Sequence, residues 1–162
     1  MGRYPHRATA TAADDRRALG LARGLAGIED LWEREYLRLS GGERQRVQFA
    51  RAVAQVAPVD AVPRALLLDE PTSSLDLRYQ HEILAAARRL ARDHGVAVAA
   101  VTHDPNLAVA YADDVLLLRP GEVEYSGRAD GLAAGHLSAA YGIAVDGIDR
   151  PGGRMFAWRP AA

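Results

Sequence analysis

The stretch Ala65–Asp76, Ala-Leu-Leu-Leu-Asp-Glu-Pro-Thr-Ser-Ser-Leu-Asp, determines how the rest of the chain is interpreted. Its three consecutive leucines show no alternation with polar residues, so they predict a strand buried on both faces of a parallel sheet. Asp69 and Glu70 follow at its carboxyl end, where ligands bind in open α/β sheets, and Pro71 ends it. Because neighbouring strand residues point to opposite faces, the two carboxylates are expected to have different roles. Taken alone, the segment also fits an ordinary strand-to-helix junction.

A second marked segment lies upstream and reads Leu-Ser-Gly-Gly-Glu-Arg-Gln-Arg, residues 39–46. Ser40 and Glu43 have the spacing of a capping box at the start of a helix. Gly41 and Gly42 leave backbone amides bare at this positive helix end, which favours an anion such as phosphate. A capping box needs no glycine pair, so we favour a phosphate-contacting role.

The other elements follow from apolar periodicity and from helix and turn signals. Helices are expected at 11–24, 28–32, 40–57, 76–94, 105–112 and 131–141. Strands are expected at 66–68, 96–101, 113–118 and 123–126, with a terminal hairpin of 143–145 and 155–158. The strand at 96–101 is followed by Thr102-His103-Asp104, which puts His103 at a second strand end. A lone histidine in such a place is commonly just a polar terminus.

Composition limits the classes of function. The 162 residues suffice for one domain or part of one. A net charge of −1 gives no indication of a nucleic-acid partner. The absence of cysteine excludes disulfides, thiolate catalysis and cysteine-ligated metals. No apolar run reaches the roughly 20 residues that span a bilayer, so membrane contact is expected through a partner.

All 20 basic residues are arginine. A P-loop requires Gly-x-x-x-x-Gly-Lys followed by Ser or Thr, because the lysine reaches the β- and γ-phosphates of the nucleotide. These residues therefore contain no P-loop.

In order and spacing, the segments resemble the motifs of ATP-binding cassette (ABC) ATPases. The segment at 39–46 is similar to the signature motif, 65–70 to the Walker B strand, and 73–76 to the D-loop. His103 stands where that family has its switch histidine. The opening Gly2–His6, Gly-Arg-Tyr-Pro-His, resembles a segment in the helical subdomain of ABC ATPases that import iron complexes, haem and cobalamin. The resemblance extends to about Gly142.

This resemblance implies an α/β fold, namely the C-terminal portion of the P-loop NTPase fold of an ABC ATPase. It would comprise a helical subdomain and a parallel-sheet core and would lack the N-terminal Walker A half. The helical subdomain is expected over residues 1–58, ending in the signature helix. The RecA-like core portion is expected over 59–142, and a C-terminal tail over 143–162.

The resemblance also implies a role for each motif residue. Glu70 would polarise the attacking water, and His103 would contact the γ-phosphate. Asp69 would help to hold Mg²⁺, which prefers hard oxygen ligands. In the family, two subunits form a head-to-tail dimer in which the signature motif of each closes over the nucleotide of the other. The resemblance implies that five residues contact ATP in this way: Ser40, Gly41, Gly42, Gln45 and Asp76. Asp76 also suits the N-cap of the following helix.

The resemblance implies that the chain is a fragment of the ATP-binding and ATP-hydrolysing subunit of an ABC importer, which takes up haem or another iron complex. ATP and Mg²⁺ would be its cofactors. Its partners would be membrane permease subunits, a second ATPase subunit and, indirectly, a substrate-binding protein. It would lie peripherally on the cytoplasmic face of the inner membrane.

The missing P-loop, adenine-stacking region and glutamine loop predict that the chain alone is inactive. Three hypotheses follow. The chain is part of a complete ATPase, or a separately made half that needs a second chain with a P-loop, or a non-catalytic remnant. A fragment of a DNA-repair-type ABC ATPase is a further alternative, but no long heptad segment supports it.

Overall fold

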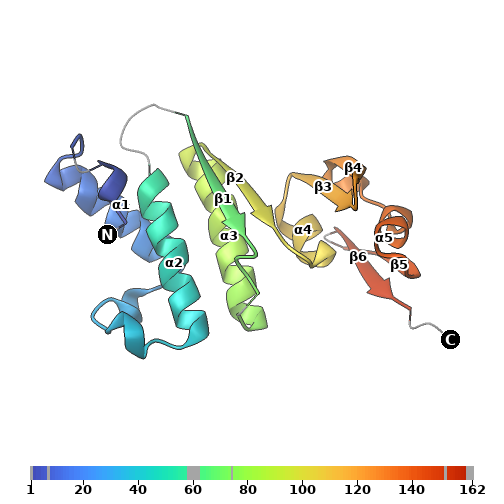
Figure 1. Cartoon of the computed structure of the whole chain (residues 1–162), viewed down its shortest axis with the longest axis horizontal. Coiled ribbons are helices and arrows are strands. Elements are labelled where there is room, and N and C mark those ends of the chain that lie inside the picture. Colours follow the sequence, from blue (N-terminus) through green and yellow to red (C-terminus); the bar gives the residue numbers. More distant parts are fainter. Residues whose placement is uncertain (1, 7, 58–62, 74, 152, 160–162) are drawn as a thin grey trace. The chain divides into compact units, whose positions relative to one another are not determined.

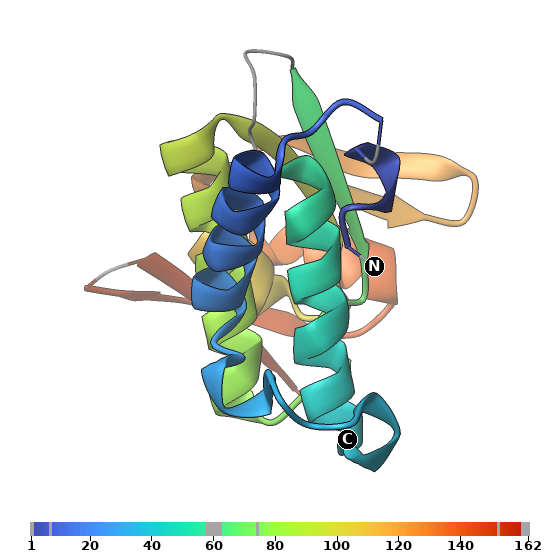
Figure 2. The same ribbon diagram turned by 90° about the vertical axis from the view of Figure 1, so that its left-hand side faces the viewer.

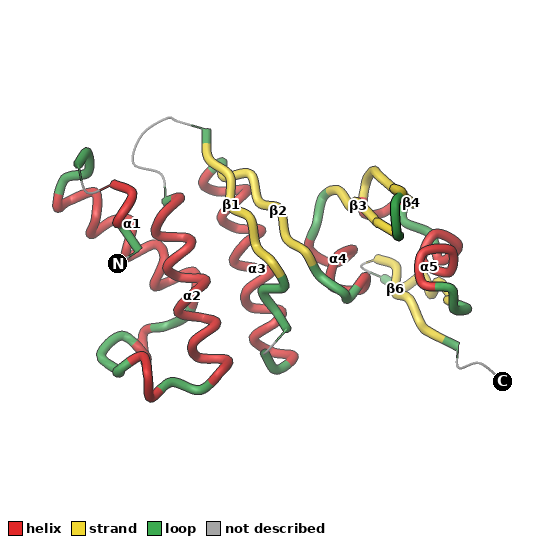
Figure 3. Tube along the Cα trace, viewed as in Figure 1, coloured by secondary structure: helices red, strands yellow, loops and turns green. Residues whose placement is uncertain are grey.

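A computed structural model of the chain describes residues 2–6, 8–57, 63–73, 75–151 and 153–159. They form two compact units, Met1–Thr102 and His103–Ala162. The elements of the first unit are η1 (Tyr4–His6), α1 (Ala12–Ala26), η2 (Glu29–Leu31), η3 (Tyr36–Arg38), α2 (Gly41–Val56), β1 (Arg64–Asp69), α3 (Leu77–His94) and β2 (Val96–Val101) (Figure 1). Those of the second unit are α4 (Pro105–Tyr111), β3 (Asp114–Arg119), β4 (Glu122–Arg128), η4 (Ala129–Gly131), α5 (Ala134–Tyr141), β5 (Val145–Arg150) and β6 (Gly153–Trp158) (Figure 3). The division at 58/59 falls on residues outside the described ranges, so the three-part domain assignment stays a prediction.

Polar caps set the helix ends. At the start of α2, the Ser40 hydroxyl accepts from the Glu43 N–H and the Glu43 carboxylate accepts from the Ser40 N–H, which confirms the capping box. The side chain of Asp76 accepts from the Tyr79 N–H and caps α3. Gly95 ends that helix with φ of 65°, a left-handed conformation that glycine adopts without steric cost. In the described part of the chain, no helix is long and apolar enough to span a membrane.

The predicted central strand forms and is parallel to its neighbour. β1 pairs with β2 in a register that runs from Arg64 opposite Val96 to Asp69 opposite Val101. Burial of β1 differs from the prediction, because Leu66 and Leu68 are buried whereas Leu67 is 79% exposed. Successive strand side chains point to opposite faces, and the core cluster of the unit lies on the face of Leu66 and Leu68. The leucine run is therefore covered on one face.

Three helices supply that cover. α2 packs against β1, α3 packs against β2, and α1 contacts both helices (Figure 2). Their apolar faces meet in one cluster, in which Val53 and Leu90 are completely buried. Burying side chains of this size removes apolar surface from water at roughly 25 cal/mol per Å², the main favourable term in folding. The cluster thus fixes α2 against the strand that carries Asp69.

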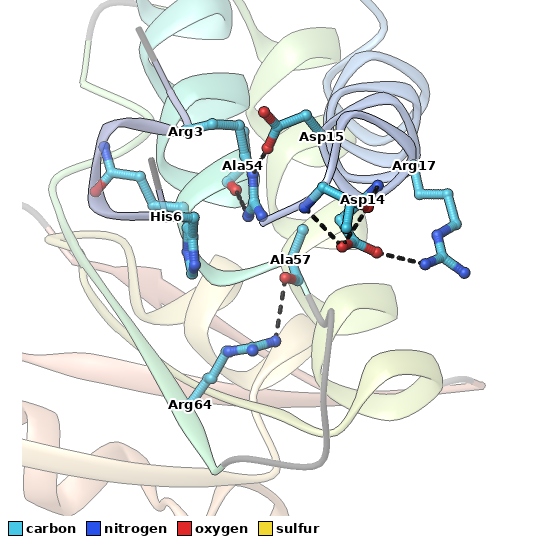
Figure 4. A network of polar contacts seen from close by, with 10 residues as sticks. Arg3, His6, Asp14, Asp15, Arg17, Ala54, Ala57 and Arg64 are labelled. Atoms are coloured by element: carbon cyan, nitrogen blue, oxygen red, sulfur yellow. Dashed lines mark hydrogen bonds and ion pairs between the residues drawn. The ribbon is translucent and has the colours of Figure 1, made fainter. Parts of the chain in front are cut away.

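The segment before α1 is packed rather than loose. Arg3, only 7% exposed, donates from Nε to Asp15 of α1 at 2.8 Å and from Nη1 to the Ala54 carbonyl of α2 at 3.0 Å (Figure 4). The Nε2 of His6 lies 2.7 Å from the carbonyl oxygen of Gln55. A Cβ at Gly2 would lie 3.0 Å from that of Ala54, so a larger residue would force the segment away from α2. The first residues therefore bridge α1 and α2.

The second unit is built on two antiparallel hairpins. β3 pairs with β4 around the Pro120-Gly121 turn, where Gly121 has φ of 79°, a positive value that glycine adopts without steric cost. α5 packs against both hairpins. A second core cluster contains four buried residues, Leu132, Leu137, Val145 and Phe156.

The terminal hairpin is longer than predicted. β5 begins at Val145, where the predicted strand ends, and pairs with β6 from Val145 opposite Trp158 to Arg150 opposite Gly153. Its residues after Val145 are mostly polar and are exposed, so they lack the apolar signal on which the prediction depended. Phe156 is buried and Trp158 lies edge-on to Tyr141, so these aromatic side chains have a packing role.

Asn106 connects α4 to the terminal hairpin. Its Nδ2 donates to the Phe156 carbonyl at 3.1 Å, and its Oδ1 accepts from the Phe156 N–H at 2.7 Å. The carboxamide thus satisfies both backbone groups of one residue on the edge of β6, as a neighbouring strand would.

We expect Asn106→Ala to destabilise the second unit, because it leaves an N–H and a C=O group beside buried Phe156 without this partner. Loss of such bonds costs about 1–3 kcal/mol. The free energy of unfolding from urea titration and the exchange rate of the Phe156 amide measure the effect. Arg119→Ala, which removes an exposed ion pair with Glu122 on the β3–β4 hairpin, is the control and should cost less than about 1 kcal/mol. Equal stability of Asn106→Ala and the unchanged chain would contradict the assigned role.

Candidate functional site

The carboxyl end of β1 carries the two acids. Asp69 is exposed, Glu70 is half-buried, and β1 ends between them. Glu70 has φ of 44°, the one positive value found at a non-glycine residue among those described. This left-handed conformation costs a residue with a Cβ roughly 1–2 kcal/mol. The sequence predicted that the side chains of Asp69 and Glu70 point to opposite faces because both belong to the strand. This reason is wrong, because Glu70 follows the strand and its left-handed backbone sets the direction of its side chain.

Hydrogen bonds hold the Glu70 backbone on both sides of its Cα. Its N–H donates to the Val101 carbonyl of β2 at 3.2 Å. Its carbonyl accepts from the Ser73 N–H, the Ser73 Oγ and Gln45 Nε2, each at 3.2 Å. Unfavourable backbone conformations persist where surrounding contacts over-determine them, and they cluster at functional sites.

The D-loop segment continues from this turn into α3. Thr72 and Leu75 are buried, and their carbonyls accept from Gln80 Nε2 at 3.4 and 3.0 Å. Ser74 lies outside the described residues. Asp76 is exposed and caps α3, so its structural role is confirmed, whereas its contact with nucleotide stays a prediction.

The start of α2 has the properties of an anion site. Ser40 and Gly41 are exposed, and a Cβ at Gly41 would meet nothing within 4 Å. The first N–H groups of a helix have no partner within the helix, and the helix dipole favours negative charge there. Hydrogen bonds from Ser40, first that of its backbone N–H, lower the pKa of Glu43. That carboxylate is thus held ionised within the capping box.

Gln45 brings α2 to the end of β1. It lies one turn into the helix, and its Nε2 donates to the Glu70 carbonyl across 25 positions of sequence. Its role as a nucleotide contact stays a prediction. In the structure, Gln45 donates a hydrogen bond directly to the backbone carbonyl of Glu70, the residue that bears the carboxylate.

Arg46 is a structural residue that the sequence analysis did not identify. It is 6% exposed, its guanidinium lies 4.5 Å from the ring centroid of Tyr79 on α3, and its Nη2 lies 3.6 Å from Asp30. A signal was present, since Arg46 shares helical spacing with buried Phe49, Ala50 and Val53. It fixes the start of α2 to α3.

His103 belongs to the second unit and is exposed. The next residue, Asp104, caps α4 by accepting from the N–H groups of Asn106 and Leu107. His103 lies in a different unit from Asp69 and Glu70, so the convergence of these three residues stays a prediction.

For a metal ion, Asp69 offers one exposed carboxylate at the strand end. The described residues contain no group of three or more His, Cys, Asp or Glu side chains arranged to hold a metal. A single carboxylate fits Mg²⁺, which keeps several waters and is completed by phosphate oxygens of a substrate.

No protein-family model matches the chain. Among curated proteins, it is 45% identical over 155 residues to a protein of Burkholderia thailandensis named Hemin import ATP-binding protein HmuV, covering 92% of this chain and 57% of that protein. It is 52% identical over 125 residues to a protein of the same name from Gloeobacter violaceus, covering 76% of this chain and 45% of that protein. The chain therefore spans about half the length of these relatives.

The chain is also similar to solved structures of ABC transporters and their ATP-binding cassettes. The chain superposes on a metal-chelate type ABC transporter in an inward-facing conformation with a TM-score of 0.77 and 30% identity, over 100% of this chain and 64% of that one. It also superposes on the dimeric ATP-binding cassette MJ0796 bound to ADP and Pi, with a TM-score of 0.64 and 29% identity, over 81% of this chain and 54% of that one.

The Glu70 backbone generates a prediction about stability. We expect Glu70→Gly to be more stable than Glu70→Ala by about 1 kcal/mol, because both lose the carboxylate but only glycine adopts positive φ freely. Urea unfolding of the two variants measures the difference. Equal stabilities would mean that residue 70 is not left-handed in solution.

The capping box generates a prediction about pH. Because the pKa of Glu43 is lower in the folded chain than in the unfolded chain, its contribution to stability is complete above the unfolded value and is lost as the pH falls through the folded value. Glu43→Gln should therefore lower the urea midpoint at pH 7, and the difference from the unchanged chain should disappear in acid. Ser40→Ala is the control, since it keeps the backbone N–H that bonds the carboxylate and should retain most of the pH dependence. A difference that does not change with pH would contradict the capping role.

Proposed function

Because the chain belongs to the ATP-binding cassette (ABC) ATPases, we propose that it supplies the water-activating and γ-phosphate-contacting part of an ATPase that drives membrane transport. The observation that carries this proposal is the hydrogen bond from Gln45 of α2 to Glu70 at the end of β1. It joins an exposed, glycine-bearing helix start to a carboxylate at a strand end within one compact unit.

The predicted fold class is confirmed, since the similar solved structures are ABC ATPases and the first unit has helices packed on a parallel pair of strands. The activity, cargo and partners of the whole protein are proposals, because the chain spans 57% of the Burkholderia relative.

Glu70 is proposed as the general base. Its carboxylate would accept a hydrogen bond from the attacking water and polarise it toward the γ-phosphate. Phosphoryl transfer needs little covalent chemistry from the protein, so most of catalysis is positioning and charge neutralisation. The over-determined backbone of Glu70 suits such a positioning task.

Asp69 would hold Mg²⁺, and the ion when bound would neutralise charge on the phosphates. His103 would contact the γ-phosphate and orient the same water. The N–H groups at Gly41 and Gly42, with Ser40, Gln45 and Asp76, would contact the ATP bound by a second subunit, because a helix start favours an anion but these residues include no P-loop.

The loop that cradles the phosphates must come from outside these 162 residues, since they contain no lysine. It would be supplied by the rest of a longer polypeptide or by a second chain, and the isolated chain would not hydrolyse ATP. An in-frame segment encoding a glycine-rich loop upstream of Met1 would favour the first arrangement, and a nearby stop codon would favour the second or a non-catalytic remnant.

The cargo is proposed to be haem or a related iron chelate, on the basis of the names of the two curated relatives and of the metal-chelate type transporter. The proposed partners are a second ATPase subunit, permease subunits in the membrane and, through these, a substrate-binding protein. The chain would lie on the cytoplasmic face of that membrane.

In the complete ATPase that contains this chain, we expect Glu70→Gln to lower the rate of ATP hydrolysis by about 10²- to 10⁴-fold, the usual contribution of a general base. ATP binding should be retained, because the carboxamide has the size of the carboxylate. Single-turnover hydrolysis and equilibrium binding of labelled ATP measure the two properties. Glu82→Gln, at an exposed position of α3, is the matched control and should hydrolyse ATP normally. Normal hydrolysis by Glu70→Gln would remove Glu70 from this role.

A further inference from the structure

We propose that Gln45 is the positioning residue of Glu70: its carboxamide holds the Glu70 backbone, and with it the Cα–Cβ direction from which the carboxylate extends, and links the start of α2 to the residue that bears the water-activating group. The inference rests on the proposed role of Glu70. It differs from the role that the family resemblance implies for Gln45, which is contact with nucleotide.

The geometry of Glu70 requires such an anchor. In a residue whose N–H and C=O groups are both held, φ and ψ are fixed, and so is the Cα–Cβ direction. Val101 of β2 holds the N–H group at 3.2 Å. The carbonyl on the other side is held by Ser73 and Gln45.

The two residues that bind the Glu70 carbonyl, Ser73 and Gln45, differ in their sequence separation from Glu70. Ser73 lies three residues from Glu70 and belongs to the same turn, so it moves with that turn. Gln45 lies on another element, 25 positions away, and ties the turn to the packed helix α2. Glu70 has φ of 44°, a conformation that relaxes when external contacts are removed. Gln45 is therefore a long-range contact that holds the carbonyl of this strained residue.

The helix that carries Gln45 is itself firmly held. The next residue, Arg46, is buried against Tyr79, and Phe49, Ala50 and Val53 lie in the core cluster. A shift of the α2 start would consequently be transmitted to Glu70 by the hydrogen bond from Gln45. In the proposed dimer, this start would face the nucleotide of the other subunit, so the bond would join the two nucleotide sites within one chain.

The test compares Gln45→Met, which keeps the length of the side chain and removes the donor, with Gln48→Met. Gln48 lies on the same helix but donates to Tyr36 Oη at 2.7 Å, so Gln48→Met is the matched control. In the 162-residue chain, NMR reports φ at residue 70, because positive φ gives a strong intraresidue cross-peak between the amide and α protons. We expect Gln45→Met to weaken this cross-peak and to accelerate exchange of the Glu70 amide, and Gln48→Met to change neither. Unchanged Glu70 signals in a folded Gln45→Met chain would overturn the proposal.

In the complete ATPase, Gln45→Met should lower kcat by about 10- to 100-fold, the usual effect of misplacing a catalytic group, with the KM for ATP little changed. Gln45→Lys, which restores an N–H donor, should recover part of the loss. Combining Gln45→Met with Glu70→Gln should cause no further loss. A raised KM at unchanged kcat would instead identify a nucleotide contact and overturn the positioning role.

The two experiments separate this inference from the proposed function. If Glu70→Gln hydrolyses ATP normally, the proposed function fails, while the NMR measurement still decides whether Gln45 holds the Glu70 backbone. If Glu70→Gln is inactive and Gln45→Met is fully active, only the inference fails.

Discussion

The arrangement of the first unit depends on the backbone of Glu70, held in a left-handed conformation at the end of a parallel strand. A residue with a Cβ adopts this conformation only when its surroundings compensate for the steric cost. The compensation comes from three elements, since β2 holds its N–H, the following turn holds its carbonyl, and α2 reaches the same carbonyl through Gln45. The residue that bears the carboxylate is thus connected to β2, to the following turn and to α2.

Two buried arginines of the first unit make contacts between elements that are distant in sequence. Arg3 connects the opening segment to α1 and α2, and Arg46 connects α2 to α3 and to Asp30. Each guanidinium is satisfied only in part, because Nη2 of Arg3 and Nε of Arg46 are buried without a hydrogen-bond partner among the described residues. Arg46 holds the helix start that bears the two glycines, of which Gly41 is exposed, and Arg3 holds the other end of α2 at Ala54.

Fold and function rest on different grounds. The fold follows from the parallel pair of strands with its helices and from superposition on ABC ATPases. The function depends on chemistry that these residues hold only in part, because carboxylates and a glycine-bearing helix start are present and a phosphate-cradling lysine is not. The proposed site would consequently be one side of a nucleotide clamp, and we propose that its activity requires residues outside this chain.

The sequence alone determined what depends on near neighbours. The Ser40–Glu43 capping box, the Asp76 cap, the glycine end of α3 and the strand at 96–101 were all predictable, because each involves residues within a few positions or one apolar period. The tertiary structure decided the rest. The exposure of Leu67, the positive φ of Glu70 and the bond from Gln45 arise where segments distant in sequence meet, and no local propensity encodes which partner a backbone group will find there.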